Sequence, residues 1–241
     1  MPVGSVFDLS SSVFLSDNIH LEAELKRNGF IGPCFLDLTS CGTSGAVDRV
    51  KVLSKVHSIS VMGLMCDDDE YAKNLLDSGI RKAFFALAAD NVTGQKELLS
   101  TFPKDRVGIT LPIDCGYDIG GILSDIKEVC GNVCFTSGAS ESGVEEMETL
   151  WAAHSEVLKA MGGVYCSVPS ATESSRATID RLAKARHNLF PLVAPDMVDN
   201  VGVFLQCLKT DREDGLFATV VCDEHGVCLG LVYSNEESIR T

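Results

Sequence analysis

The sequence predicts an α/β protein, a parallel (β/α)8-like barrel followed by a C-terminal β-hairpin that starts a second, incomplete domain. Three observations lead to this fold class. Short apolar runs alternate with amphipathic stretches along most of the chain, which is typical of strands and helices in a parallel sheet. Glycines such as Gly79 stand where an amphipathic stretch ends and an apolar run follows. Near the end of the chain, two apolar runs flank a polar turn.

Eight apolar runs are expected to be the barrel strands, each followed by a helix. They are Val3–Leu9, Pro33–Leu38, Ser58–Gly63, Arg81–Leu87, Val107–Leu111, Val133–Thr136, Val164–Val168 and Phe190–Ala194. Eight consecutive strand–helix units favour a closed barrel, because right-handed crossovers in an uninterrupted series close the sheet on itself. An open doubly wound sheet is the alternative, since a reversal of strand order leaves no mark on the periodicity.

The clearest helix is expected over Val144–Met161. Its apolar residues recur at helical spacing, so they form one buried stripe. His154 falls on the same stripe. We interpret it as a histidine at the edge of the core, and not as a chemical group.

The last part of the chain is expected to form a hairpin of strands Leu216–Cys222 and Val227–Tyr233 around a turn at Asp223–Gly226. Glycine in such a turn can take the positive φ that a short hairpin connection needs. This gives two expected domains, 1–208 and 209–241. A two-stranded hairpin is marginally stable and leaves unpaired edges, so it should need a cover of further strands or of another surface.

Composition excludes several classes of partner. The chain has 241 residues, is 45% hydrophobic and carries a net charge of −14, which argues against nucleic-acid and membrane partners because both favour basic patches. A small phosphorylated ligand stays compatible with this charge. The N-terminus has no signal or transit pattern, so a cytoplasmic location is expected. The ten cysteines are scattered without a Cys-x-x-Cys pair and are expected to be mostly small buried residues.

The terminal segment resembles the start of phosphoribosyl-AMP cyclohydrolase, as found in fungal-type multifunctional histidine-biosynthesis proteins. The resemblance lies in Arg212-x-Asp214-Gly215-Leu216, Cys228-Leu229-Gly230-Leu231-Val232-Tyr233-Ser234 and Glu237-Ser238-Ile239. It implies zinc and magnesium for the complete domain, whose metal motifs do not follow Ile239 here. No metal site and no cofactor are therefore expected in this chain, which should be inactive alone. The resemblance also allows a homodimer through the completed domain. The alternative is an unrelated hairpin with a glycine turn.

A second resemblance, over residues 3–115, is to the barrel of the histidine-pathway ribotide isomerase. It rests on Val6-Phe7-Asp8-Leu9, Phe35-Leu36-Asp37-Leu38 and Ile59-Ser60-Val61-Met62-Gly63. It implies that Asp8 is a catalytic acid or base. The reaction needs a second carboxylate across the barrel, and Asp114 is the candidate, although Pro112 occupies the expected register. The alternative is that both are ordinary loop carboxylates.

The strongest candidate for binding phosphate is Thr136-Ser137-Gly138, because two hydroxyls and a glycine amide at a strand end can surround an oxyanion. The alternative is an ordinary strand-to-helix turn. Phosphate binding after the third strand is disfavoured, because the glycine triplet of the isomerase family is reduced here to Gly63.

The sequence thus predicts a histidine-biosynthesis protein of the phosphoribosyl-AMP cyclohydrolase family, whose reaction is the hydrolytic ring opening of phosphoribosyl-AMP. Two alternatives remain for the barrel. It could isomerise a phosphorylated ribotide, or it could be a non-catalytic scaffold that docks other enzymes of the pathway. A phosphorylated ribotide is the expected small-molecule ligand.

Overall fold

The computed structural model divides the chain into two compact units, Pro2–Val198 and Asp199–Thr241 with Met1. Each unit is described by itself. The structure describes residues 4–8, 22–23, 25, 33–39, 43–55, 57–65, 69–113, 116–136, 142–167, 189–193, 201, 205 and 208–240.

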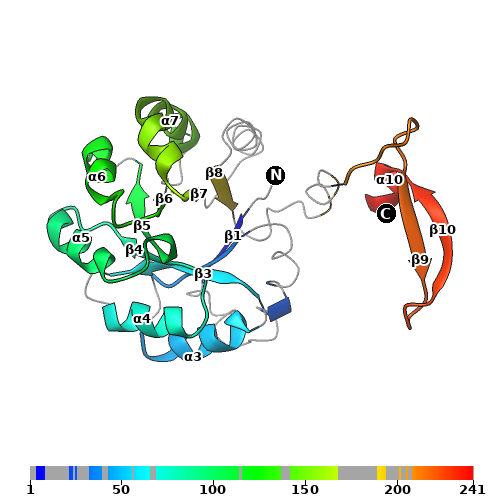
Figure 1. The fold of residues 1–241 in the computed structure, drawn as a ribbon, viewed down its shortest axis with the longest axis horizontal. Helices are drawn as coiled ribbons and strands as arrows, with labels where there is room; N and C mark the ends of the chain where they lie inside the picture. The colour runs from blue at the N-terminus through cyan, green and yellow to red at the C-terminus, as the bar shows by residue number, and fades with distance from the viewer. Residues whose placement is uncertain are drawn as a thin grey trace. The chain divides into compact units, whose positions relative to one another are not determined.

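The first unit is a closed barrel of eight parallel strands in the order β1 to β8 (Figure 1). The strands are β1 (Gly4–Asp8), β2 (Cys34–Asp37), β3 (Ile59–Leu64), β4 (Ala83–Ala86), β5 (Val107–Pro112), β6 (Asn132–Thr136), β7 (Gly163–Ser167) and β8 (Leu189–Val193). Each strand pairs with the next one along the chain, and β1 closes the ring by pairing with β8 through Gly4 and Leu192. The predicted closed barrel is confirmed, and the open doubly wound alternative is wrong.

Helices cover the outside of the barrel between the strands (Figure 1). They are α3 (Thr43–Ser54), α4 (Asp69–Asp77), α5 (Val92–Ser100), α6 (Ile119–Ile126) and α7 (Ser142–Ala160), with a short 3-10 helix η1 at Lys104–Arg106 before β5. The long predicted helix corresponds to α7, but His154 has non-helical angles (φ −122°, ψ 22°) and interrupts it. His154 is partly buried, as expected for a residue at the edge of the core.

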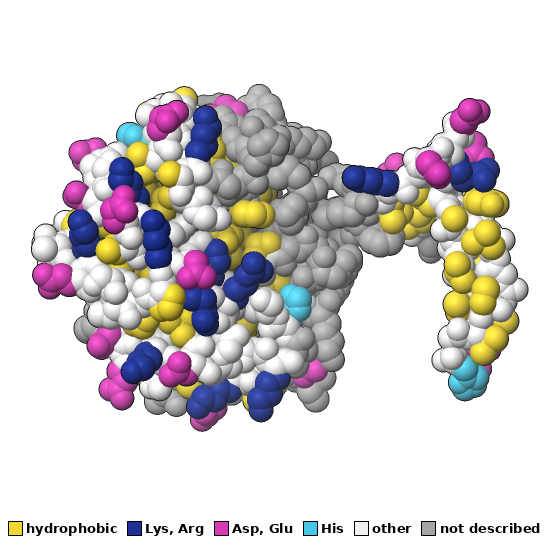
Figure 2. Space-filling model, viewed as in Figure 1, with side chains coloured by type: hydrophobic (Ala, Val, Ile, Leu, Met, Phe, Trp, Pro, Cys, Tyr) yellow, Lys and Arg dark blue, Asp and Glu magenta, His cyan; other side chains and the backbone are white. Residues whose placement is uncertain are grey.

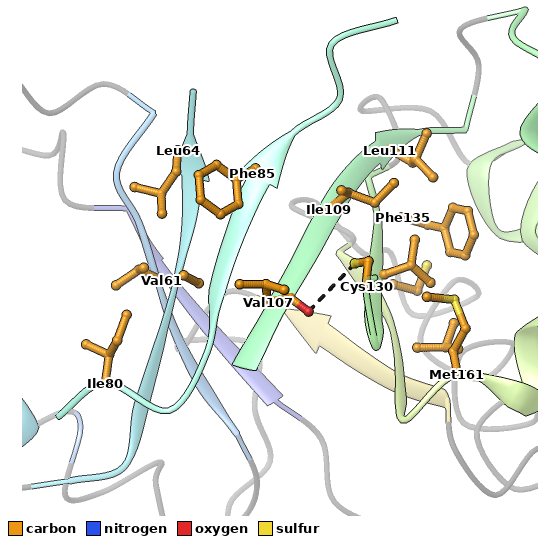
Figure 3. Close-up of a cluster of buried hydrophobic side chains, with 14 of the residues drawn as sticks. Val61, Leu64, Ile80, Phe85, Val107, Ile109, Leu111, Cys130, Phe135 and Met161 are labelled. Carbon is orange, nitrogen blue, oxygen red and sulfur yellow. Dashed lines mark hydrogen bonds between the residues drawn. The ribbon is translucent and has the colours of Figure 1, made fainter. Parts of the chain in front are cut away.

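The core has two layers because the barrel strands bury both faces, which is why they read as nearly continuous apolar runs. The outer layer lies between strands and helices and includes Val61, Phe85 and Ile109 (Figure 3). In this layer the Cys130 thiol lies 3.7 Å from the carbonyl oxygen of Val107 as a hydrogen-bond donor. The inner layer fills the barrel and consists of Phe35, Met62, Phe84, Cys134, Tyr165 and Leu192, with Phe190 packed against it.

Aromatic rings form the centre of the inner layer. The ring centroid of Phe35 lies 5.3 Å from that of Phe84 and 5.0 Å from that of Tyr165. Phe84 meets Tyr165 edge-on, with an interplanar angle of 90°. Gly108 on β5 makes room for this cluster, because a Cβ there would lie 2.4 Å from the Phe84 ring. The barrel interior is therefore packed by side chains, and no channel runs through these rings.

The second unit contains an antiparallel hairpin of β9 (Phe217–Cys222) and β10 (Cys228–Ser234), followed by the short helix α10 (Glu236–Arg240). The predicted hairpin is confirmed to within one residue at each strand end. Gly226 in the turn has φ 80°, as the sequence predicts. The sequence also predicts a helix over Asp199–Leu208, which lies largely outside the described residues.

Candidate functional site

The carboxyl ends of the barrel strands are the first candidate site, because ligands of parallel barrels bind at this edge. Asp37, the last residue of β2, accepts two hydrogen bonds at one carboxylate oxygen. The backbone N–H of Thr39 donates at 2.9 Å and its hydroxyl at 2.6 Å. The strand register places Asp8, the last residue of β1, directly beside Asp37. Two carboxylate residues therefore end neighbouring strands.

Gly63 supports this corner of the barrel. From Val61 to Leu64 strand β3 advances three residues, while β4 advances two from Ala83 to Phe85, so β3 contains a bulge. Gly63 lies in the bulge with φ 85°. A Cβ there would lie 2.4 Å from the Thr39 hydroxyl and 2.6 Å from the Thr39 nitrogen. Glycine is required because it lets β3 approach the residue that binds Asp37.

Thr136 ends β6 and is the one phosphate candidate that the structure describes. It is partly buried, and the register aligns it with Pro112 on β5 and Ser167 on β7. Its carbonyl oxygen accepts a hydrogen bond of 2.9 Å from the N–H of Ile113. Strand β6 is four positions from β2 in the ring, so Thr136 and Asp37 face each other across the barrel mouth.

The remaining candidates from the sequence are not placed. Ser137, Gly138 and Asp114 lie outside the described residues. The structure therefore brings Asp8 beside Asp37 and leaves the pairing of Asp8 with Asp114 as a prediction. Asp37 was not a candidate from the sequence, although it ends a predicted strand directly after a buried run. That position is the signal that could have identified it.

The four barrel cysteines that the structure describes, Cys34, Cys130, Cys134 and Cys166, are buried and do not suit a nucleophilic role. Burial raises the pKa of Cys34 and Cys166 to about 12 and that of Cys130 to about 11, and it raises the pKa of Cys134 as well. Their thiols stay protonated at physiological pH, whereas a reactive cysteine needs the thiolate. The prediction of buried cysteines is confirmed for these four. Cys222 and Cys228 on the hairpin are the exposed exceptions among the described cysteines.

The hairpin is the second candidate site, and two charged residues that precede β9 form an ion pair there. Arg212 donates from Nε to the Asp214 carboxylate at 2.9 Å and pairs with the same carboxylate through a second nitrogen. This hydrogen bonding lowers the pKa of Asp214. The Arg212 guanidinium also lies 4.1 Å from the ring centroid of Tyr233 on β10. Arg212 therefore connects the motif before β9 to the end of β10.

Large apolar side chains are exposed along the hairpin. Figure 2 shows them as yellow patches over β9 and β10. Leu229 is 67% exposed, Val220 58% and Leu231 57%. Soluble proteins rarely leave such a contiguous apolar surface uncovered unless it is an interaction surface. The apolar surface of the hairpin is therefore a candidate interaction surface.

The described part of the chain shows neither a metal-binding cluster nor a helix that could span a membrane. No group of three or more His, Cys, Asp or Glu side chains there could hold a metal ion. None of the helices in that part combines the length and apolarity that crossing a bilayer would need.

Sequence comparison finds similarity over short segments. The chain is 47% identical over 49 residues to the histidine biosynthesis bifunctional protein his7 of Schizosaccharomyces pombe, and these residues cover 20% of this chain and 12% of that protein. It is 62% identical over 32 residues to the histidine biosynthesis trifunctional protein of Saccharomyces bayanus, covering 13% of this chain and 4% of that protein. The histidine biosynthesis trifunctional protein of Neurospora crassa is 64% identical over 32 residues, which cover 13% of this chain and 4% of that protein. No family model matches the chain.

Solved structures that resemble the chain share its fold. A dipeptide epimerase from Methylococcus capsulatus superposes with a TM-score of 0.55 at 14% identity, covering 97% of this chain and 66% of that one. QR15, an aldolase, superposes with a TM-score of 0.56 at 10% identity. The superposition covers 86% of this chain and 94% of that one. At these identities the likeness establishes the fold alone. The short sequence matches link the chain to fungal histidine-biosynthesis proteins, of whose length they span a small part.

Proposed function

We propose that this chain is part of a histidine-biosynthesis protein and that residues 209–241 form the first hairpin of a phosphoribosyl-AMP cyclohydrolase domain. One observation carries the proposal. The residues that resemble this family, Arg212, Asp214 and Tyr233, lie together at one end of a hairpin whose apolar side chains are exposed. The matches to fungal histidine-biosynthesis proteins support the pathway.

The proposed reaction is the hydrolytic opening of the adenine ring of phosphoribosyl-AMP. Zinc and magnesium are expected for the complete domain, where a metal would supply an activated water. The described residues of this chain do not fit such a site, since they contain no cluster of metal-binding side chains. We therefore expect this chain to be inactive alone.

A graft tests the proposal in cells. In Schizosaccharomyces pombe, the chromosomal copy of his7 is replaced by a version that carries residues 209–241 of this chain in the place of the corresponding segment. Growth without histidine is expected, and Leu231→Asp in the graft should abolish it, because a buried carboxylate would disrupt the completed sheet. Glu224→Gln in the exposed turn is the matched control and should grow. Failure of the unmodified graft, at normal protein abundance, would contradict the proposal.

A direct assay tests the expected inactivity. The purified 241-residue chain is incubated with phosphoribosyl-AMP, zinc and magnesium, and ring opening is followed by absorbance. No turnover is expected. Turnover that requires the metal would show that residues outside the described ranges form a site, and our assignment of inactivity would then be wrong.

A second candidate function rests on the neighbouring ends of β1 and β2. Asp8 and Asp37 could supply the acid and the base of a ribotide isomerase. The chain is assayed with the isomerase substrate, together with Asp8→Asn and Asp37→Asn. Isomerase activity should fall at least about a hundredfold in each variant if both groups transfer protons. Absence of turnover in the unmodified chain would favour the third alternative, a barrel that acts as a scaffold.

The proposal includes a cytoplasmic location and self-association through the completed hairpin domain. The first is supported by the reduced, buried cysteines of the barrel. The second is supported by the exposed apolar residues of β9 and β10. Fluorescence microscopy of the tagged protein and sedimentation of the chain test them separately.

A further inference from the structure

The amino ends of the barrel strands form a cavity lined by cations. Arg81 and Lys82 precede β4, and Lys104 and Arg106 belong to η1 before β5. Because β4 and β5 are neighbours, these two loops meet at one rim. The cavity has a volume of about 950 Å³. Its described lining includes Arg81, Lys82, Lys104, Asp105, Arg106 and Asn132.

The two inner cations of this cavity are held by neutral groups. Arg106 donates to the backbone carbonyl oxygens of Arg81 at 2.9 Å and Ile80 at 2.8 Å. Lys82 donates to the side-chain oxygen of Asn132 and, at 3.3 Å, to the Tyr165 hydroxyl. Its ammonium also lies 5.6 Å from the centroid of the Tyr165 ring. These contacts fix the positions of the cations but do not neutralise them.

Among the described lining residues, four positive charges therefore face one negative charge. Among the described residues none of the four cations forms an ion pair, and Asp105 is the carboxylate in the lining. The pKa of Lys82 is lowered, first by burial and then by the charge of Arg81. Clustering like charges destabilises the protein unless a counter-ion compensates them. This cluster occurs in a chain whose net charge is −14.

The shape of the cavity selects the kind of anion. Its volume lies in the range of small-molecule sites, which is about 300–1,000 Å³. Arg81 and Lys104 are exposed at the rim, while Lys82 and Arg106 are partly buried. Figure 2 shows lysine and arginine side chains gathered near the middle of the barrel face that it presents. Arginine and lysine together suit phosphate oxygens, and the described part of the lining contains no aromatic side chain that could stack on a base.

We propose that this cavity at the amino ends of β4 and β5 binds a small, multiply charged phosphate compound through Arg81, Lys82 and Lys104. Recognition is through the phosphate groups, which both inorganic pyrophosphate and the phosphate chain of a nucleotide supply. The site lies at the edge of the barrel opposite to Asp37 and Thr136, and it is independent of the hairpin and of the proposed ring-opening reaction.

Calorimetric titration of the 241-residue chain with inorganic pyrophosphate tests the proposal. Binding at one site per chain is expected, and it should weaken as salt is raised. Arg81→Gln and Lys104→Gln should each weaken binding about fivefold or more, since each removes one charge near the anion. Asp105→Asn should tighten it, because it removes the carboxylate from the lining. Both altered cations are exposed, so these variants should fold, which a thermal unfolding scan verifies.

Lys96→Gln on α5 is the matched control. It removes the same charge from an exposed lysine outside the lining and should change the affinity less than about twofold. Equal weakening by Lys96→Gln and Lys104→Gln would show nonspecific attraction and overturn the proposal. No binding at millimolar pyrophosphate would also overturn it. Titration with ATP and AMP distinguishes a nucleotide ligand from inorganic pyrophosphate. If ATP competes with pyrophosphate, the site accepts a nucleotide. If pyrophosphate binds and ATP does not compete, the ligand is the inorganic ion.

Discussion

The barrel buries large apolar residues, whereas the hairpin exposes them. The barrel buries Phe35, Phe84 and Phe85 completely. The hairpin leaves Leu229 and Leu231 more than half exposed. Both regions are built from similar β-branched and aromatic strands, so the difference lies in what covers them. A closed ring with helices outside buries both faces of each strand, whereas two antiparallel strands have no second layer.

This contrast indicates that the two regions gain stability from different sources. The barrel unit has its own core and should unfold as a cooperative unit. The hairpin is stabilised by the hydrogen bonds between β9 and β10, by its turn and by the contact between Arg212 and Tyr233. The single tryptophan of the chain, Trp151, is buried on α7 and reports on the barrel alone. Its fluorescence therefore gives a way to test the comparison by mutation.

Phe84→Ala should have the largest effect. Removing a fully buried ring from the centre of the barrel should lower the free energy of unfolding by about 3–5 kcal/mol. Urea unfolding followed by Trp151 fluorescence measures it. Because a Cβ on Gly108 would occupy the space of this ring, Gly108→Ala should cost less in the Phe84→Ala background than in the unmodified chain. If the losses in the free energy of unfolding of the two variants add up, Gly108 and the Phe84 ring do not compete for the same space.

Thiol labelling should separate the two regions by about a hundredfold in rate. Cys222 and Cys228 are exposed and should react readily with iodoacetamide at pH 8. Cys166 should stay unlabelled, because burial raises its pKa to about 12 and the thiolate forms only as the pH approaches that value. Raising the pH from about 7 to 9 should therefore leave it protected. Peptide mass spectrometry identifies the labelled residues, and rapid labelling of Cys166 in the folded chain would contradict the packed barrel.

Gly63→Ala should lower the stability of the barrel by about 2 kcal/mol. The substitution places a Cβ on a residue with positive φ and only 2.4 Å from the Thr39 hydroxyl. Gly226→Ala is the matched control, since Gly226 also has positive φ but nothing lies within 4 Å of its Cβ position. Its effect should not reach the Trp151 transition. If both variants shift that transition equally, the close approach to Thr39 is not the cause.

Leu231→Ser should have the smallest effect on the unfolding of the barrel, less than about 0.5 kcal/mol, because an exposed side chain loses few contacts. It should instead reduce the binding of a dye that detects exposed apolar surface. A large shift of the Trp151 transition would contradict the small contribution that we expect from this exposed side chain.

Much of the fold could be predicted from the sequence. The eight strands stand within one or two residues of their predicted bounds, because strands buried on both faces leave apolar runs that helices and glycines separate. The interruption of α7 at His154 could not be predicted, since the apolar spacing continues through it. The closure of the ring was predicted, but the pairing of β1 with β8 was needed to exclude an open sheet.

Less of the candidate sites could be predicted from the sequence. Asp8 and Thr136 were identified because they end predicted strands. Asp37 gained importance only when the register placed it beside Asp8. The cationic cavity left no motif, since Lys82 and Lys104 are separated along the chain and meet through strand pairing.

The sequence alone determined which segments are strands and helices, and that two kinds of sheet follow one another. These properties depend on local periodicity and turn residues. The tertiary structure decided that the sheet closes, that aromatic rings fill it and that four cations share one cavity. Those outcomes depend on contacts between residues far apart in the chain, and the hydrophobic pattern does not encode which distant side chains become neighbours.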